Sequence, residues 1–238
     1  MNTITGTPPL VLLAGHWLGA WAWDEVLAHL PSHSAHALTL PGLDPGDADR
    51  AERTLDDQVA AIVDMLTTLD APAVLVAHSG ANAPVSVVLD RHPERVRRVV
   101  WVDSGPWDGR AFAPDLPAEA RDLLLPAFDA LAQQASLEGL TPDLLERFRE
   151  RAVAEPASVL RQSVAWGNEA RHHVPTTLVC CSLPSAHVHE LAGAGHPMFA
   201  EVARLTRAES VDLPTGHWPM WSRPRDLARV ILAAARQD

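Results

Sequence analysis

The sequence predicts a single α/β domain in which a mostly parallel sheet is covered by helices on both faces. The length of 238 residues fits one domain. A hydrophobic content of 47% is enough for a substantial core without a disulfide or a metal. Short apolar runs alternate with segments of helical spacing along most of the chain, which is the pattern of repeated strand–helix units.

Apolar runs bounded by turn residues are the predicted strands. Gly15 ends the first run, and Pro41-Gly42 ends the second. We expect a sheet of roughly six to eight strands. The segments identified are Leu10–Ala14, Ala35–Leu40, Ala73–Ala77, Val96–Val102, Thr176–Cys181 and Ser210–Leu213.

Helical periodicity marks the segments between these strands. Thr54, with Asp57 three residues later, is typical of a helix N-terminus. It follows a predicted loop at Leu43–Arg53 that is rich in Asp, Gly and Pro. The predicted helices are Trp21–Leu30, a segment from Thr54 through Leu66, Asn82–Arg91, and a last helix from about Arg223 to Arg236.

From about Pro106 to Val174 the alternation stops, and only helical patterns are found, such as Ala118–Gln134 and Pro142–Ala154. A helical insertion between two strands of a parallel sheet would lie over the carboxyl ends of the strands, where such sheets bind ligands. We therefore expect residues 106–174 to form a cap or lid within the single domain 1–238. The alternative is that these helices pack on one face of the sheet.

The charged residues of the chain indicate which partners and which chemistry are not expected. The net charge is −11, and all 19 positive side chains are Arg. An acidic chain is not expected to bind nucleic acid or anionic membranes, and the lack of Lys excludes Schiff-base and P-loop lysine chemistry. No leader-like pattern is found in Met1–Pro9, and no apolar run is long enough to span a bilayer. A cytoplasmic location is predicted.

The remaining reactive side chains predict neither a metal site nor a disulfide. Cys180-Cys181 lies in an apolar run and is interpreted as two buried thiols in a reducing compartment. His172-His173 and His187-Val188-His189 lack partnering carboxylates at ligand spacing. We expect no metal, no cofactor and a small molecule as partner, and the oligomeric state stays open.

The strongest local signal is the predicted strand that runs into Ser79. In Val74-Leu75-Val76-Ala77-His78-Ser79-Gly80-Ala81 a serine lies between small residues and before a predicted helix. This is the form of a nucleophile elbow, although Ala77 and Ala81 replace the two glycines of the strict motif. Such a turn would hold the hydroxyl clear of the sheet and direct the backbone N–H of Gly80 toward a developing oxyanion. The alternative is a serine that caps the helix.

Two further loops complete the candidate site. Gly15 follows the first predicted strand, so the backbone N–H of His16 is the expected second oxyanion donor. His217, preceded by Gly216, lies after the last predicted strand and is the expected base for Ser79. The role of the His16 side chain stays open.

Several stretches outside residues 106–174 resemble sequence motifs of a known family. They are Gly15-His16-Trp17-Leu18-Gly19-Ala20-Trp21-Ala22-Trp23, Leu40-Pro41-Gly42-Leu43, Pro93-Glu94-Arg95-Val96, Val102-Asp103-Ser104 and His217-Trp218-Pro219-Met220-Trp221-Ser222-Arg223-Pro224. With them the chain resembles the α/β-hydrolases, in the branch that contains plant methylesterases and hydroxynitrile lyases. The resemblance implies an α/β-hydrolase fold, a Ser79 nucleophile and a His217 base, and it identifies no substrate.

Three positions depart from that branch. Ala14 stands where the family has His, and Trp218 stands where hydroxynitrile lyases have Lys, so cyanohydrin cleavage is not expected. The stretch Cys181-Ser182-Leu183-Pro184 offers no carboxylate where the acid of the family lies.

A histidine base needs a group that holds its tautomer and stabilises its charge. Asp103, at the end of the strand after the nucleophile strand, is the candidate, with Glu190 and Asp212 as weaker ones. The alternative is that Asp103 only caps the next turn.

A second resemblance involves the same residues. Asp103 with Trp107, Ser182-Leu183-Pro184 and His217-Trp218-Pro219 are similar to stretches of cofactor-independent dioxygenases of the 3-hydroxy-4-oxoquinaldine type. That resemblance implies that His217 deprotonates a bound aromatic alcohol, which Ser79 orients. A third hypothesis is a hydrolase homologue that binds a ligand without turnover.

The sequence as a whole favours a serine hydrolase that cleaves an ester or lactone through an acyl-enzyme. Trp17, Trp107 and Trp218 each lie close to a proposed site residue, so we expect them to contact a small apolar or aromatic substrate. The alternative for each tryptophan is packing in the core or under the cap.

Overall fold

Six parallel strands form the central sheet of the computed structural model, which describes residues 7–32 and 34–237. The expectation about a leader in Met1–Pro9 falls mostly on residues outside this range. The strand order is β2-β1-β3-β4-β7-β8, and each neighbouring pair is parallel. The strands are β1 (Leu10–Leu13), β2 (Ala35–Leu38), β3 (Ala73–His78), β4 (Val96–Val102), β7 (Thr176–Cys180) and β8 (Ala208–Asp212).

Helices follow the strands along the chain. The α-helices are α1 (Asp24–Leu27), α2 (Leu55–Thr67), α3 (Asn82–Arg91), α4 (Phe128–Leu131), α5 (Pro142–Arg151), α6 (Ala157–Arg161), α7 (Ser185–Gly193), α8 (Pro219–Ser222) and α9 (Pro224–Ala235). The 3-10 helices are η1 (Ala20–Trp23), η2 (Arg50–Glu52), η3 (Ser79–Ala81), η4 (Pro93–Arg95), η5 (Glu169–His173), η6 (Pro197–Phe199) and η7 (Val202–Arg204). The α/β prediction is confirmed, although Trp21–Leu30 forms η1 and α1 instead of one helix.

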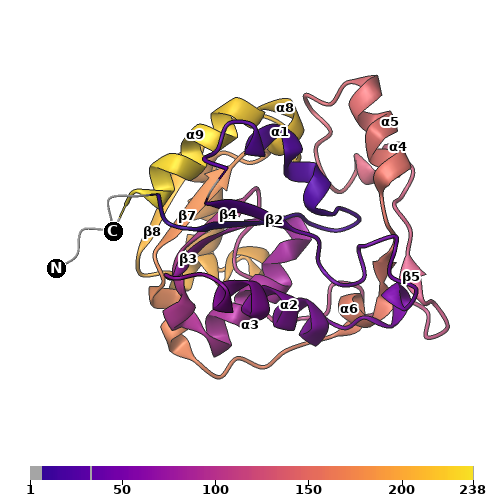
Figure 1. Ribbon diagram of the computed structural model, residues 1–238, viewed down its shortest axis with the longest axis horizontal. Coiled ribbons are helices and arrows are strands. Elements are labelled where there is room, and N and C mark those ends of the chain that lie inside the picture. The colour runs from indigo at the N-terminus through magenta and orange to yellow at the C-terminus, as the bar shows by residue number, and fades with distance from the viewer. Residues whose placement is uncertain (1–6, 33, 238) are drawn as a thin grey trace.

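Helices cover both faces of the sheet because alternate strand residues point to opposite faces and both sets are apolar. On β4, Val100 and Val102 belong to the core cluster under α1, α8 and α9, while Val99 and Trp101 belong to the cluster under α2, α3 and α7. Figure 1 shows α1 and α9 on one side of the sheet and α2 and α3 on the other. The residues of both clusters are buried, as the apolar runs of the sequence predict.

The part of segment 106–174 that contains α4 and α5 lies beyond the carboxyl ends of the strands, at the end of the molecule away from the described chain ends (Figure 1). The last part of the segment returns along α3, where the backbone N–H of Asn168 donates to the Asp90 carboxylate at 2.8 Å. The expectation of helices alone was wrong, because β5 (Asp122–Leu123) and β6 (Glu155–Pro156) form a short antiparallel pair. The predicted helix Ala118–Gln134 is reduced to α4. Pro126 explains this, since proline disrupts a helix and disfavours helical backbone at the residue before it.

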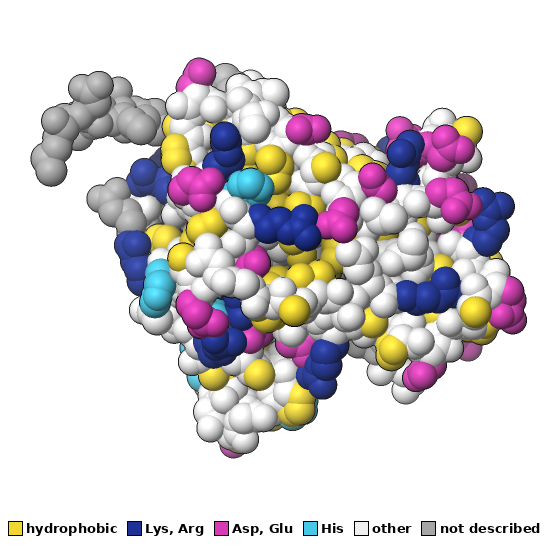
Figure 2. All heavy atoms as spheres, turned by 90° about the horizontal axis from the view of Figure 1, so that it is seen from below, with side chains coloured by type: hydrophobic (Ala, Val, Ile, Leu, Met, Phe, Trp, Pro, Cys, Tyr) yellow, Lys and Arg dark blue, Asp and Glu magenta, His cyan; other side chains and the backbone are white. Residues whose placement is uncertain are grey.

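Charged side chains of both signs are interspersed on the face shown in Figure 2. Ion pairs join neighbouring helices, and Arg91 of α3 lies 2.9 Å from Asp56 of α2. Across the part of the chain that the structure describes, no helix combines the length and apolar character needed to cross a bilayer.

A capping box begins α2, as the spacing of Thr54 and Asp57 predicts. The Asp57 backbone N–H donates to the Thr54 hydroxyl at 3.2 Å, and the Thr54 backbone N–H donates to the Asp57 carboxylate at 2.8 Å. Two N–H groups that the helix itself leaves unpaired are thereby satisfied.

We expect Thr54→Ala to lower the free energy of unfolding by about 1 kcal/mol, because the variant loses this cap. Urea denaturation of both proteins measures the difference. The matched control is Thr67→Ala at the exposed end of the same helix, where we expect a change within about 0.5 kcal/mol. Equal losses in the two variants would contradict a specific role for the capping box.

Candidate active site

Three polar side chains meet at the carboxyl edge of the sheet. Ser79 follows β3, Asp103 follows β4, and His217 lies in the loop between β8 and α8. Nε2 of His217 is 2.8 Å from Oγ of Ser79, and Nδ1 of His217 is 2.7 Å from Oδ2 of Asp103. Residues far apart in the chain therefore form one hydrogen-bonded series, because parallel strands end at the same edge.

Ser79 is the first residue of η3 and lies in the tight turn that follows β3. Its φ of +49° lies in the left-handed region, which is unfavourable for a residue with a side chain. A Cβ atom at position 15 would lie 2.6 Å from the Cβ of Ser79, so only glycine fits in the neighbouring loop. The Ser79 hydroxyl contacts His217 and does not cap α3, whose N-cap is Ala81.

Asp103 lies at the centre of a dense set of hydrogen bonds. Its Oδ1 accepts the backbone N–H groups of Cys181 at 3.0 Å and Ser182 at 2.8 Å, and its Oδ2 accepts the Ser182 hydroxyl at 2.6 Å. Burial alone would raise the pKa of Asp103, but the hydrogen bond and charge of His217 and the bonds from Ser182 hold that pKa below its ordinary value. An ionised carboxylate accepts only, so Nδ1 of His217 carries a proton.

The two weaker acid candidates are engaged elsewhere. Asp212 accepts the backbone N–H of Ser185 at 2.7 Å and its hydroxyl at 2.8 Å. Glu190 lies 3.2 Å from Nδ1 of His187 on the exposed side of α7. Within the described residues, Asp103 is thus the carboxylate that contacts His217.

His16 and Gly80 come from two loops that lie against each other, since a Cβ atom at position 80 would be 2.4 Å from Nε2 of His16. The His16 backbone N–H has no hydrogen-bond partner in residues 7–32 and 34–237. Gly80 is the second residue of η3, where a helix has no partner of its own for the N–H group. Both residues line the cavity described below, together with Ser79 and His217.

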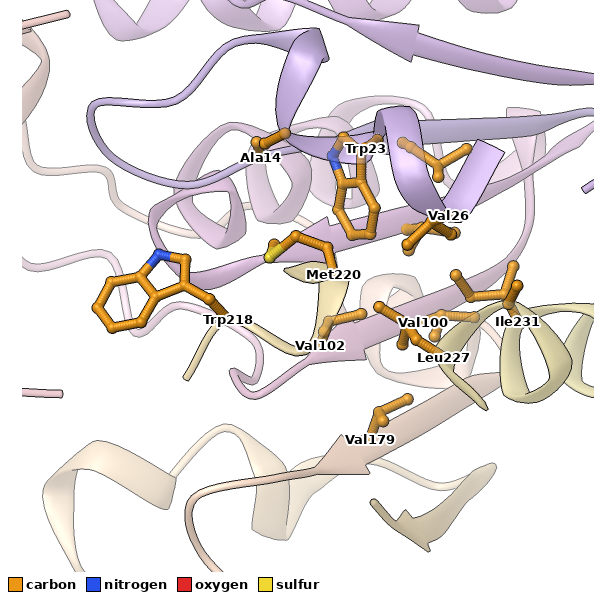
Figure 3. Packing of buried hydrophobic residues seen from close by; sticks show 14 of the residues in the cluster. Ala14, Trp23, Val26, Val100, Val102, Val179, Trp218, Met220, Leu227 and Ile231 are labelled. Carbon is orange, nitrogen blue, oxygen red and sulfur yellow. The ribbon is translucent and has the colours of Figure 1, made fainter. Parts of the chain in front are cut away.

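The three tryptophans that we expected at the substrate are placed differently. Trp107 lines the cavity and packs edge-on against Trp166, with ring centroids 5.6 Å apart. Trp17 and Trp218 belong to the hydrophobic core and are 7% and 3% exposed. Figure 3 shows the Trp218 indole at the end of the packed cluster, beyond Met220.

The expectation that Trp17 and Trp218 contact substrate is therefore corrected. Neither is among the described residues that line the cavity. His16 and His217 line the cavity, whereas the rings of Trp17 and Trp218 pack in the hydrophobic core.

His78 is a buried residue to which the sequence reasoning assigned no role. Its Nε2 donates to the backbone carbonyl of His217 at 2.8 Å, and its Nδ1 accepts the Gly15 N–H at 3.4 Å. Burial, followed by the charge of His217, lowers the pKa of His78 to about 3. The neutral ring joins the Gly15 and His217 loops to β3, and a polar residue in an apolar strand was the available signal.

A cavity of about 500 Å³ opens beside Ser79. This volume is in the range of small-molecule sites. Much of its lining is apolar, and residues 106–174 contribute several of the side chains, namely Trp107, Phe112, Ala135, Val159 and Leu160.

The same segment also contacts the His217 loop directly. The backbone N–H of His217 donates to the carbonyl of Ser136 at 2.8 Å. A Cβ atom at position 216 would lie 2.4 Å from the carbonyl oxygen of Glu138, so Gly216 permits this close approach.

The elbow, the strand order and the position of His217 define a class of protein. Residues 10–230 match the sequence model of the α/β hydrolase family, and the chain belongs to that family.

More particular similarities are to esterases. Methylesterase 7 of Arabidopsis thaliana is 33% identical over 113 residues, which is 44% of this chain and 40% of that protein. Putative methylesterase 14 of the same plant is 29% identical over 98 residues, or 39% of this chain and 28% of that protein. The chain thus matches well under half the length of these curated relatives.

Solved structures share the fold over nearly the whole chain. An extracellular α/β-hydrolase from a Paenibacillus species has a TM-score of 0.74 and 20% identity, covering 97% of this chain and 100% of that one. A methylesterase from Arabidopsis has a TM-score of 0.71 and 14% identity, covering 95% and 98%.

The low pKa of His78 predicts a loss of stability on acidification. Unfolded His78 binds a proton below about pH 6.5, whereas the folded protein binds it only near pH 3. The unfolded state therefore holds more protons between these values, and the free energy of unfolding falls with decreasing pH, by up to about 1.4 kcal/mol per pH unit from this residue. Denaturation of wild type and His78→Gln from pH 7 to 4.5 should show a shallower slope in the variant.

The exposed residue His29 provides the matched control. We expect His29→Gln to keep the wild-type slope over the same range. A His78→Gln slope equal to that of wild type would show that the buried ring does not determine this pH dependence.

Proposed function

We propose that this protein is a serine esterase that hydrolyses carboxylic esters of small, apolar or aromatic acyl groups. The observation that carries the proposal is the unbroken hydrogen-bonded series Ser79–His217–Asp103 at the wall of an apolar cavity of about 500 Å³. An ionised acid, an oriented imidazole and a hydroxyl in this order are the parts of a nucleophilic acyl-transfer site.

In the first half of the reaction, Ser79 Oγ attacks the carbonyl carbon of the ester while Nε2 of His217 accepts the hydroxyl proton. The oxygen of the tetrahedral intermediate becomes negative and accepts hydrogen bonds from the backbone N–H groups of His16 and Gly80. The carbon–oxygen bond to the alcohol then breaks. His217 returns its proton to the departing alkoxide, which leaves as the alcohol and leaves Ser79 acylated.

In the second half, water takes the place of the alcohol. His217 removes a proton from this water, which attacks the acyl carbon, and the same N–H groups stabilise the second tetrahedral intermediate. The bond to Ser79 breaks, the serine oxygen takes the proton back from His217, and the carboxylic acid is released. Asp103 keeps the proton on Nδ1 and stabilises the imidazolium during both halves.

We further propose that residues 106–174 act as the cap of this site. The segment supplies Trp107, Phe112 and Leu160 to the cavity and bonds to the backbone of His217 through Ser136. An apolar cover of this kind excludes water and strengthens the electrostatic interactions at the carbonyl.

The similar proteins support an esterase. The relatives include methylesterases of Arabidopsis thaliana, and the solved structures of the same fold include polyneuridine aldehyde esterase and a pyrethroid hydrolase from Sphingobium faniae. We also propose a cytoplasmic location, which is supported by two free, buried thiols. Burial raises the pKa of Cys180 to about 11 and that of Cys181 further.

A fluorophosphonate probe tests the activated serine. We expect labelling at Ser79, identified by mass spectrometry of the modified peptide, and no labelling in Ser79→Ala or His217→Ala. In Asp103→Asn the labelling rate should fall by about 10²-fold or more, because the amide no longer stabilises the imidazolium.

Asp212→Asn is the matched control. Asp212 is the last residue of β8, and its carboxylate accepts the backbone N–H and the hydroxyl of Ser185 without contacting His217. It should label at the wild-type rate. Failure of folded wild type to react at Ser79 would refute the esterase proposal, and oxygen uptake on a hydroxy-heteroaromatic that survives Ser79→Ala would favour cofactor-independent oxygenation with His217 as the base.

A further inference from the structure

A second imidazole–carboxylate pair lies beside Ser79. Nδ1 of His16 is 3.2 Å from Oε2 of Glu155, and the two side chains are 12% and 3% exposed. His16 comes from the loop after β1, and Glu155 begins β6 in the segment 106–174. Neither side chain belongs to the Ser79–His217–Asp103 series.

Glu155 is a carboxylate in a buried position, where a charged group lowers the stability of the fold unless it has polar partners. Its carboxylate is buried, and the polar contacts found for it in the described chain are His16 Nδ1 and the backbone N–H of Trp17 at 3.4 Å. A buried carboxylate needs such partners. An unprotonated nitrogen would be repelled by a carboxylate oxygen at this distance, so Nδ1 of His16 carries a proton.

The opposite edge of the His16 ring faces the cavity above Gly80. A Cβ atom at position 80 would lie 2.4 Å from Nε2, 2.5 Å from Cε1 and 2.6 Å from Cδ2 of His16. Glycine after Ser79 is therefore what permits the ring to lie there. The other side of the ring packs on Phe112, with centroids 4.5 Å apart.

Nε2 of His16 is thus a polar atom in an apolar part of the cavity. It has no hydrogen-bond partner within residues 7–32 and 34–237, and the residue lines the cavity with Ser79 and Phe112. Since Gly80 supplies one of the proposed oxyanion donors, Nε2 lies next to the position of the scissile carbonyl.

We propose that His16 is a specificity-determining residue that binds a hydroxyl group on the carbon next to the ester carbonyl, with Glu155 as the residue that positions it. The preferred substrates are then 2-hydroxy esters, and this assignment rests on the proposed esterase function. With Nδ1 protonated, Nε2 accepts a hydrogen bond when the ring is neutral and donates one when it is charged. A hydroxyl suits both states, and a buried polar atom left unpaired discriminates against substrates that lack the group.

Methyl mandelate and methyl phenylacetate form a matched substrate pair, since they differ only in that hydroxyl. For wild type we expect kcat/KM to be at least about tenfold higher for the better enantiomer of methyl mandelate. In His16→Ala this ratio should fall to about 1. Glu155→Gln should reduce the ratio at least threefold, because the ring loses the charge that orients it, whereas a merely structural role would change both substrates alike.

Gly80→Ala gives an independent test of the geometry. The new Cβ should displace the ring and reduce the mandelate preference in the wild-type background, with no further change of the ratio in the His16→Ala background. The controls are His29→Ala and Glu190→Gln, which are exposed and should keep the wild-type ratio.

Fluorophosphonate labelling of each variant separates the two levels of the proposal. Labelling at Ser79 with a wild-type ratio near 1, or with a ratio that His16→Ala leaves unchanged, would overturn the role of His16 and leave the esterase proposal standing. Absence of both labelling and hydrolysis in folded wild type would overturn the esterase proposal and this assignment with it.

Discussion

The parallel register of β1, β3 and β4 is the constraint on which the candidate site depends. It brings the turn after Leu13, the turn after His78 and the end of β4 to one edge, side by side. At that edge Gly15 approaches Ser79 so closely that a Cβ atom would lie 2.6 Å from the serine. The positions of the strands therefore determine the backbone conformation around the Ser79 hydroxyl. The loops at this edge then place further side chains next to that hydroxyl.

Buried polar residues then connect loops that the sheet alone would leave independent. Neutral His78 links the Gly15 turn to the carbonyl of His217. Glu155 links the segment 106–174 to the loop of His16 and Trp17. Trp17, with φ of +66°, is held in this strained conformation by further bonds, in which its carbonyl accepts the Val153 N–H and its indole donates to the Leu123 carbonyl. Segment 106–174, which lines part of the cavity, thus also holds the backbone of the proposed oxyanion loop.

The position of Asp103, the proposed acid, depends on the neighbouring strand. The stretch after β7 has no carboxylate, yet its backbone and Ser182 donate three hydrogen bonds to Asp103 from the neighbouring strand. Because β4 and β7 are adjacent in the sheet, a carboxylate on either could reach the same imidazole. Asp103 stays ionised and in one orientation because hydrogen-bond donors that follow β7 stabilise its carboxylate.

Local sequence determined the six strands, the capping box at Thr54 and the elbow at Ser79, because apolar runs, N-cap chemistry and small residues in a tight turn act over a few neighbouring residues. It also predicted His217 and Asp103 as candidates from their positions after strands, and in the structure both belong to one hydrogen-bonded series with Ser79. Contacts between distant segments were decided by tertiary structure alone. These include the pairing of His16 with Glu155, the links made by His78, and the burial of Trp17 and Trp218, because the direction of a loop side chain depends on what packs against it from elsewhere in the chain.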